Sequence, residues 1–190
     1  CAIAYHGMSG NQMNRLLVVL LFIMNLSPAK AQMLALKSNA LMDVAMVPNI
    51  GIEVATGNKT SLCANGFASW SIYGMKAKTY GFVPEFRYWL SGNTFSKIFL
   101  GVGATFAYYD ICAAGNNYCG STYGAGLNIG YDYWLSKHWS IEFHGGVGLN
   151  YYHHARTDEH DILPESPQYN DQGWTVLPYQ LGVTFVYVIK

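Results

Sequence analysis

The chain has 190 residues, of which 51% are hydrophobic, 15% aromatic and only 12% charged, and its formal net charge is 0. An average soluble domain carries roughly twice that charged fraction, and a chain with no excess of basic residues lacks the field that attracts nucleic acid. The composition therefore argues against nucleic-acid binding, and the 15 Tyr and 20 Gly favour strands over helices.

Residues 13–31 have the pattern of an export signal. Met13-Asn14-Arg15 gives a positive start, Leu16–Leu26 is an apolar run, and Ala29-Lys30-Ala31 supplies the small residues that a signal peptidase requires. The apolar run is about half the length of a membrane-spanning helix, so we interpret it as a removed signal peptide. We expect cleavage between Ala31 and Gln32.

This signal divides the sequence into three parts. Residues 1–12 precede a plausible start at Met13, and we interpret them as an upstream extension that is foreign to the native protein. Residues 32–190 form a single exported domain. Three of the four cysteines lie in this domain, and an exported protein meets conditions in which disulfides persist.

The exported domain shows recurrent period-two alternation, most clearly over Thr122–Leu135, where one side is apolar and the other small or polar. No stretch after Gln32 contains eighteen unbroken apolar residues, so a helical membrane protein is not expected. The predicted strands are Leu34–Ala45, Asn49–Thr56, Thr60–Tyr73, Thr79–Leu90, Lys97–Tyr109, Thr122–Leu135, Trp139–Tyr152 and Thr175–Val188.

The strand number and the connections predict an all-β fold, an eight-stranded antiparallel up-and-down transmembrane barrel of the outer-membrane type. Short periplasmic turns are expected at 57–59, 91–96 and 136–138. The outer connections are expected at 74–78, 113–119 and 154–173, with an unusually tight one at Val47-Pro48.

The side-chain inventory predicts which face of the barrel meets lipid. The Gly-rich side carries opposite charges that suit a narrow lumen as a paired network: Lys37, Asp43, Glu53, Glu85, Arg87, Asp132, Glu142 and His144. The bulky apolar side must then face outward, which lipid accepts and water does not. A soluble barrel of the lipocalin type, with the opposite orientation, is the rival fold.

Aromatic residues gather near the ends of the predicted strands, as in the interfacial girdles of membrane barrels. Ordinary strand propensity is the alternative reason for their abundance. The residues assigned to the girdles are Tyr73, Tyr80, Tyr88, Trp89, Tyr108, Tyr133, Trp134, Trp139, Tyr151, Tyr179 and Tyr187.

Several ordered motifs resemble a known family. They are Lys37-Ser38-Asn39-Ala40-Leu41-Met42-Asp43, Pro48-Asn49-Ile50-Gly51-Ile52-Glu53, Pro84-Glu85-Phe86-Arg87-Tyr88-Trp89, Tyr123-Gly124-Ala125-Gly126, Gly130-Tyr131 and Lys137-His138-Trp139-Ser140-Ile141-Glu142. Together they resemble domain of unknown function 3575, an uncharacterised family of Gram-negative outer-membrane barrels. The resemblance implies a location in the outer membrane and supplies no catalytic residues.

Three further groups of residues are candidates for a disulfide, a metal site or a catalytic nucleophile. Cys112 and Cys119 flank the tip of an outer hairpin and are equally consistent with a disulfide or with free thiols. His153, His154 and His160 are weak metal-ligand candidates, because no defined ligand spacing accompanies them, so no metal and no cofactor are predicted. Ser121 is a rim candidate for a nucleophile, but no motif selects it, so we do not predict an enzyme.

We therefore expect a barrel in the outer membrane of a Gram-negative bacterium, with a structural role in the cell envelope or a role in presenting its outer loops. Its partners would be outer-membrane lipids, the barrel-insertion machinery and an extracellular partner at the loop 155–173. A narrow small-solute channel is the main alternative. A lipid-modifying enzyme at the rim and a soluble carrier are more remote ones.

Overall fold

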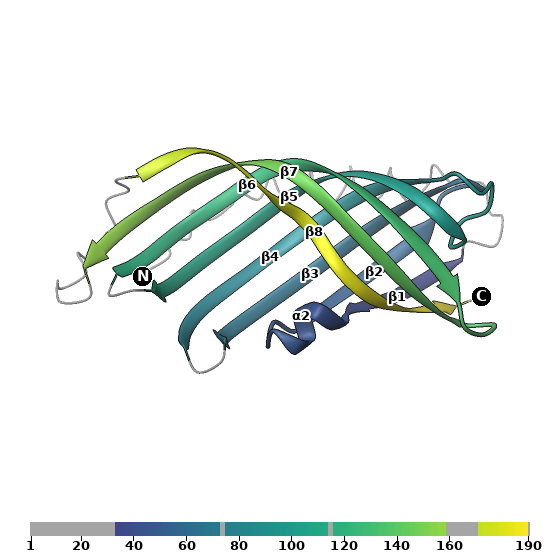
Figure 1. Ribbon diagram of the computed structural model, residues 1–190, viewed down its shortest axis with the longest axis horizontal. Helices are drawn as coiled ribbons and strands as arrows, with labels where there is room; N and C mark the ends of the chain where they lie inside the picture. The colour runs from purple at the N-terminus through teal and green to yellow at the C-terminus, as the bar shows by residue number, and fades with distance from the viewer. Residues whose placement is uncertain (1–32, 73–74, 114–115, 159–170, 190) are drawn as a thin grey trace, which may run out of the picture.

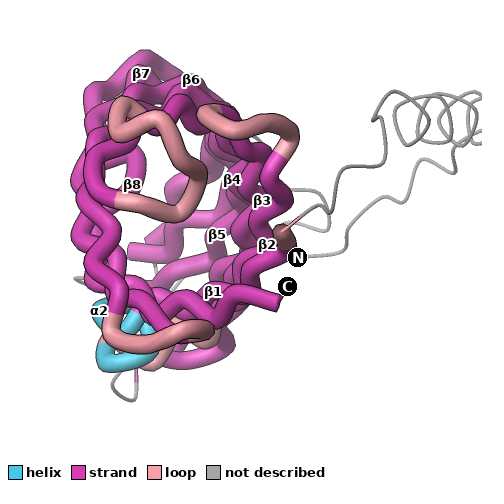
Figure 2. The backbone as a smooth tube through the Cα atoms, turned by 90° about the vertical axis from the view of Figure 1, so that its right-hand side faces the viewer, coloured by secondary structure: helices cyan, strands magenta, loops and turns pink. Residues whose placement is uncertain are grey.

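A computed structural model describes residues 33–72, 75–113, 116–158 and 171–189, which form a closed antiparallel barrel (Figure 1). Each strand pairs with its neighbours in the chain, and β1 pairs with β8 to close the barrel. Figure 2 shows the strands arranged in a ring. The strands are β1 (Leu34–Asn39), β2 (Asn49–Ala55), β3 (Thr60–Ile72), β4 (Met75–Trp89), β5 (Lys97–Ala113), β6 (Asn116–Trp134), β7 (Trp139–Asp158) and β8 (Asp171–Ile189). The predicted eight-stranded up-and-down barrel is thus confirmed.

We call the end where β1 begins and β8 ends the terminal end, and the opposite one the far end. At the terminal end, the three predicted short connections are confirmed at 56–59, 90–96 and 135–138. At the far end, β4 to β8 continue beyond the predicted limits, because backbone pairing persists after the alternation fades. Ala113 of β5, for example, still pairs with Asn116 of β6, inside a segment that was predicted to be a connection.

The predicted strand Leu34–Ala45 is wrong beyond Asn39, where the chain turns into the helix α2 (Ala40–Val44). The Asn39 side chain caps the helix by accepting a hydrogen bond from the Leu41 amide at 3.0 Å. Asparagine offers the backbone this alternative to a ladder bond, so it favours a cap over a continued strand. The first far-end connection therefore runs from Asn39 to Asn49 and is not the tight turn expected at Val47-Pro48.

This early turn leaves a notch in the far half of the wall. The last pair between β1 and β8 joins Asn39 to Thr184, whereas β8 continues to Asp171. Helix α2 packs beside β8 at this level (Figure 1). On the other side of the notch, the Ala68 amide of β3 donates to the Pro48 carbonyl at 3.0 Å.

The terminal half of the lumen is filled by an apolar plug. Its buried members are Ala35, Ala55, Trp89, Phe95, Phe99, Val186 and Val188. Phe95 belongs to the connection between β4 and β5 and has a positive φ of 57°, which turns its side chain into the barrel. The indole nitrogen of Trp134 donates to the Phe95 carbonyl and holds the connection in place.

Three of the aromatic side chains assigned to the outer girdles instead pack inside the barrel, and one of them is Trp134, which lies against the plug. Trp89 belongs to the plug, and Tyr179 of β8 is buried across the lumen, with its hydroxyl 3.5 Å from the Pro84 carbonyl of β4. A β-carbon at Gly126 would overlap the Tyr179 ring, so this glycine makes room for it. Tyr73 lies outside the described residues. No helix in the described part of the chain is long and apolar enough to cross a membrane.

The glycine at position 126 gives a first prediction. The change Gly126→Ala should lower the free energy of unfolding by about 1–3 kcal/mol, because the new methyl group is forced against the Tyr179 ring. Gly145→Ala is the matched control, since its β-carbon would meet only Leu181 Cδ1 at 3.6 Å. Denaturant unfolding followed by tryptophan fluorescence measures both, and equal midpoints would contradict the packing assigned to Tyr179.

Candidate functional site in the barrel lumen

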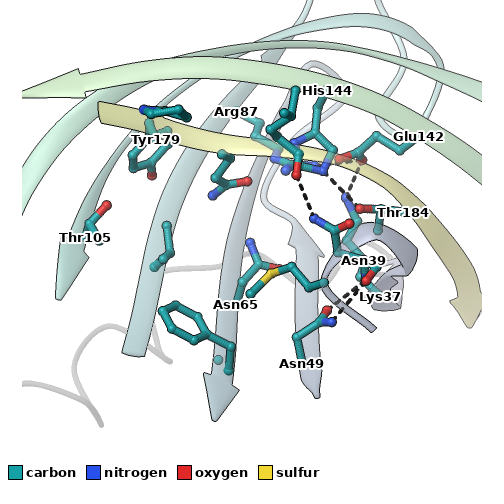
Figure 3. A pocket seen from close by; sticks show the side chains of 17 residues that line it. Lys37, Asn39, Asn49, Asn65, Arg87, Thr105, Glu142, His144, Tyr179 and Thr184 are labelled. Carbon is teal, nitrogen blue, oxygen red and sulfur yellow. Dashed lines mark hydrogen bonds and ion pairs between the residues drawn. The ribbon is translucent and has the colours of Figure 1, made fainter. Parts of the chain in front are cut away.

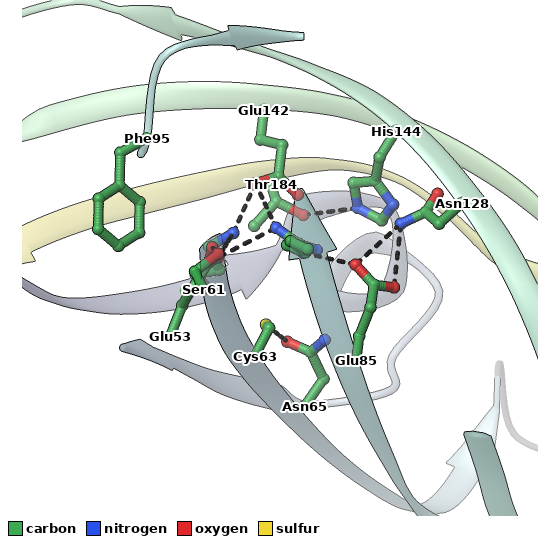
Figure 4. Close-up of polar contacts among 12 residues, drawn as sticks. Glu53, Ser61, Cys63, Asn65, Glu85, Phe95, Asn128, Glu142, His144 and Thr184 are labelled. Carbon is green, nitrogen blue, oxygen red and sulfur yellow. Dashed lines mark hydrogen bonds and ion pairs between the residues drawn. The ribbon is translucent and has the colours of Figure 1, made fainter. Parts of the chain in front are cut away.

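A network of ion pairs centred on Arg87 is buried in the lumen. Figure 4 shows how its carboxylates, Glu53, Glu85 and Glu142, converge. The Arg87 Nε donates to Glu85 Oε1 at 2.5 Å, and its Nη1 lies 3.0 Å from Glu53 Oε2 and 2.8 Å from Glu142 Oε2. Lys37 Nζ bridges the same two carboxylates, Glu53 and Glu142. One guanidinium and one ammonium therefore hold three carboxylates from β2, β4 and β7 together.

A second layer of neutral groups positions the charged ones. Ser61 Oγ donates to Glu53 Oε1 at 2.5 Å and accepts from the Trp89 indole at 2.8 Å. Asn128 Nδ2 donates to Glu85 Oε2 at 3.2 Å. The guanidinium of Arg87 lies 4.3 Å from the centre of the Phe99 ring, a cation–π distance. Together with Thr184 of β8, the charged and neutral residues of the two layers come from all eight strands.

His144 adjoins the network on the far side. Its Nε2 lies 3.0 Å from the Thr184 hydroxyl of β8, and both side chains are buried. The ring Nδ1 of His144 has no hydrogen-bond partner among the described residues. The same holds for Glu142 Oε1, whereas the other oxygen of Glu142 carries both ion pairs.

Burial of the network decides whether water can pass. The side chains of Lys37, Glu53, Glu85, Arg87 and Glu142 are at most 2% exposed. A water-filled pore would leave its lining groups accessible, so the middle of the lumen is closed by paired charges. Buried ion pairs are tolerated when their remaining polar atoms are also bonded, as Glu53 is by Ser61.

Most of the predicted lumen charges are in this network, but two are not. Asp43 was predicted to face the lumen and is instead exposed on α2, where it accepts from Ser38 Oγ at 2.6 Å and Asn49 Nδ2 at 2.9 Å. The prediction failed because the helix ended the alternation on which it rested. Asp132 is buried as predicted, but neither of its oxygens has a hydrogen-bond partner among the described residues.

The residues that sequence reasoning missed are the neutral ones. Ser61, Asn128 and Phe99 have the same inward parity as the charged residues of their strands or of the strands beside them, which is a signal that could have identified them. The lumen residues were predicted from their charge, so these neutral residues were overlooked. Trp89 shows the inward parity of Arg87 and Glu85, yet its aromatic character suggested a girdle.

Beyond the network toward the far end lies a cavity of about 370 Å³ (Figure 3). Glu142 and His144 line it on the network side, and Tyr179 and Phe67 line it elsewhere. It also touches Met42 of α2 and reaches the edge of β8 that β1 leaves unpaired.

The cysteine and histidine candidates lie near the far end or outside the described residues. Cys119 lies opposite Asp110, and Cys112 lies opposite Asn117, so the two cysteines are two positions out of direct opposition. The side chain of Cys112 is not among those described, so the disulfide stays a prediction. Cys63 is buried in the lumen, as its parity indicated, with its Sγ 3.6 Å from Asn65 Oδ1.

The metal candidates are likewise only partly placed. His153 of β7 lies opposite Gln172 of β8 and opposite Ser121 of β6, whereas His160 and the side chain of His154 are outside the described part. Among the residues that the structure describes, no group of three or more His, Cys, Asp or Glu side chains could hold a metal ion.

Comparison with known proteins gives one match. A family model described as "Protein of unknown function (DUF3575)" matches residues 16–189, which include all eight strands. No curated protein matches the chain, and no solved structure matches it. The resemblance drawn from the sequence motifs is confirmed by the family model.

The network gives a second prediction. The change Arg87→Met should lower the free energy of unfolding by about 3–5 kcal/mol, because it leaves buried carboxylates without their central cation. Asp132→Asn is the control, since it removes a buried charge that has no ion pair in the described structure, and no loss is expected. Urea unfolding of the two variants beside the wild type tests this. A similar loss in both would mean that pairing with Arg87 contributes nothing particular.

Proposed function

The chain belongs to the DUF3575 family, and on this premise we propose that it is an outer-membrane β-barrel with a closed lumen and a structural or surface-loop role in a Gram-negative cell envelope. The proposal includes export by the signal at 13–31, insertion by the barrel-insertion machinery, and no catalytic step. It treats the narrow channel as the alternative to be tested.

The observation that carries this proposal is the outer face of the barrel. Large apolar side chains on all eight strands point outward and are roughly half exposed, including Leu36, Ile52, Leu62, Phe86, Val102, Leu127, Phe143 and Leu181. Monomeric soluble proteins rarely expose a continuous apolar surface of this extent, whereas lipid requires one. Six charged residues of the strands are meanwhile buried in the lumen, as in small membrane barrels and opposite to a soluble carrier: Lys37, Glu53, Glu85, Arg87, Asp132 and Glu142. Lys78 and Lys97 are exposed.

Aromatic side chains bound this apolar face at two levels. Toward the far end, Tyr123, Tyr151 and Trp174 form a row across β6, β7 and β8 with ring centres 5.3 Å apart. Toward the terminal end, Tyr133 lies on β6 and Trp139 packs against Tyr187 at 5.0 Å.

The spacing of the two levels fits a bilayer. Tyr123 and Tyr133 are ten residues apart on β6. At about 3.3 Å per residue and a tilt of about 45°, this separation spans roughly 23 Å along the barrel axis. The apolar band of outer-membrane barrels is about 25 Å tall, so the rows stand where interfacial girdles would.

The lengths of the strands support a role for the far end. β6, β7 and β8 have 19, 20 and 19 residues, whereas about 9–11 residues cross a membrane. The excess lies at the far end, beyond the row that contains Tyr123. The strand ends at Asp158 and Asp171, within the predicted recognition loop 155–173, would therefore stand above the membrane, where a partner can reach them.

A charge placed on the outer face distinguishes lipid from water. The change Leu127→Arg, in the middle of the apolar outer face, should destabilise a barrel in lipid by about 2–4 kcal/mol. In a soluble barrel, the same exposed position would accept arginine at little cost. The control is Leu135→Arg, just beyond the end of β6, where the effect should be near zero. Folding into lipid vesicles, followed by urea titration, measures both variants. Equal free energies of unfolding would count against an apolar outer face in contact with lipid.

A direct test begins with expression from Met13. We expect the protein in the outer-membrane fraction, with faster gel mobility in unboiled than in boiled samples, because the barrel resists denaturant until heated. Planar bilayers containing the purified protein should show no discrete conductance steps. A soluble periplasmic product would refute the membrane location, and regular steps would favour the channel.

A further inference from the structure

The far-end cavity is unused by the proposed function, yet it is built like a ligand site. Its volume of about 370 Å³ falls within the range of small-molecule pockets. One part of its lining is polar and contains Lys37, Arg87, Glu142 and His144, all more than nine-tenths buried. The rest includes the apolar groups of Met42, Phe67 and Tyr179. A largely apolar pocket with a few convergent polar groups is the usual form of a binding site.

Four buried polar atoms on the lining have no hydrogen-bond partner among the described residues. They are Thr105 Oγ1, Glu142 Oε1, His144 Nδ1 and Gln180 Nε2. Buried polar groups are normally paired, so their convergence on one cavity marks where a ligand would supply the partners. The Gln180 amide nitrogen donates, the Glu142 oxygen accepts, and the Thr105 hydroxyl does either. A ligand group that both donates and accepts, such as a hydroxyl, matches this set.

The charge balance of the network restricts the ligand further. Glu53, Glu85 and Glu142 are held by only two cations, and Asp132 adds another buried carboxylate. The two cations, Lys37 and Arg87, also line the cavity, but they are already paired with these carboxylates, so an anionic group would have to compete with Glu53, Glu85 and Glu142 for them. The polar end of the ligand is therefore uncharged.

The notch in the wall, where α2 and not a strand covers the cavity, is the side from which the apolar end would leave. β1 stops at Asn39, so the edge of β8 beside Leu181 has no strand partner from β1, and Met42 of α2 lies at the same place on the cavity lining. The neighbouring Leu41 and Leu181 are exposed on the outside. A hydrocarbon chain that left the cavity here would pass from the apolar lining onto the apolar outer face.

We propose that the cavity binds a single-chain amphiphile with an uncharged, hydroxylated head group, of which a monoacylglycerol is the simplest example. The head would lie on Glu142 and His144, and the chain would leave between Met42 and the β8 edge. This inference rests on the proposed function in one respect, because the membrane would be the source of the amphiphile.

The test uses the full chain purified in detergent and native mass spectrometry with 1-oleoylglycerol as the probe. We expect one bound molecule per barrel. Oleate has the same chain with an anionic head and should bind at least tenfold more weakly, and glycerol, which lacks the chain, should not bind. Equal binding of oleate would overturn the assigned head group, and binding of glycerol alone would overturn the amphiphile.

Variants of the lining separate a site from general detergent-like adsorption. Thr105→Val and Gln180→Leu remove polar atoms that have no described protein partner, so they should fold normally and reduce 1-oleoylglycerol binding at least tenfold. Ser140→Ala is the matched control, because it also removes a buried hydroxyl, but one that does not line the cavity. Unchanged binding in the first two variants would refute the site.

The notch has its own pair of variants. Met42→Trp should obstruct the path of the chain and weaken binding, whereas Leu41→Trp, on the same helix but off the lining, should not. Every variant is also examined for the heat-dependent gel shift. Absence of that shift in the wild type would count against the proposed function. Absence of a lining-dependent adduct in protein that shows the shift would overturn this inference alone.

Discussion

The structure depends on one buried constraint, which is the contact of Arg87 with three carboxylates from three different strands. A guanidinium presents its donors in a fixed plane, so the acceptors must arrive from set directions. Glu53, Glu85 and Glu142 can meet it together only if β2, β4 and β7 surround a common axis. The network therefore requires a closed sheet, whereas the number and stagger of the strands set the radius that it fills.

The glycines and the apolar outer residues follow from the same constraint. A lumen that contains long charged and aromatic side chains has room for them only where a neighbouring strand has no side chain. Gly101 faces Glu85 in this way, and Gly130 faces Phe99. The alternating positions are then left for the outside, where Leu and Val accumulate. The alternation of small and bulky residues along each strand thus indicates that side chains fill the interior of the barrel.

Much of this could be predicted from the sequence, because period-two alternation reports directly on which side of a sheet a residue lies. It placed Lys37, Arg87 and Glu142 in one lumen without any knowledge of their contacts. It failed at Asp43, where the Asn39 cap ended the strand, since capping is a local competition that alternation does not record. It also could not rank the partners of Asp132, because pairing depends on distances across the barrel. The cavity lies where β1 and β2 are short, and no local sequence pattern predicted their lengths.

The seam between β1 and β8 has a consequence for the order in which the barrel assembles. It joins six residue pairs, whereas β6 and β7 join through nineteen. Its partners are also the most distant in the chain, so closing it carries the largest loop entropy for only a few backbone bonds. Hairpin pairing from β3 to β8 would come early, and the seam would form last. Lys37 of β1 reaches past β8 to Glu142 of β7. The ion pairs of its ammonium group form only when β1 joins the sheet. They then slow the separation of β1 from β8, which few backbone hydrogen bonds hold together.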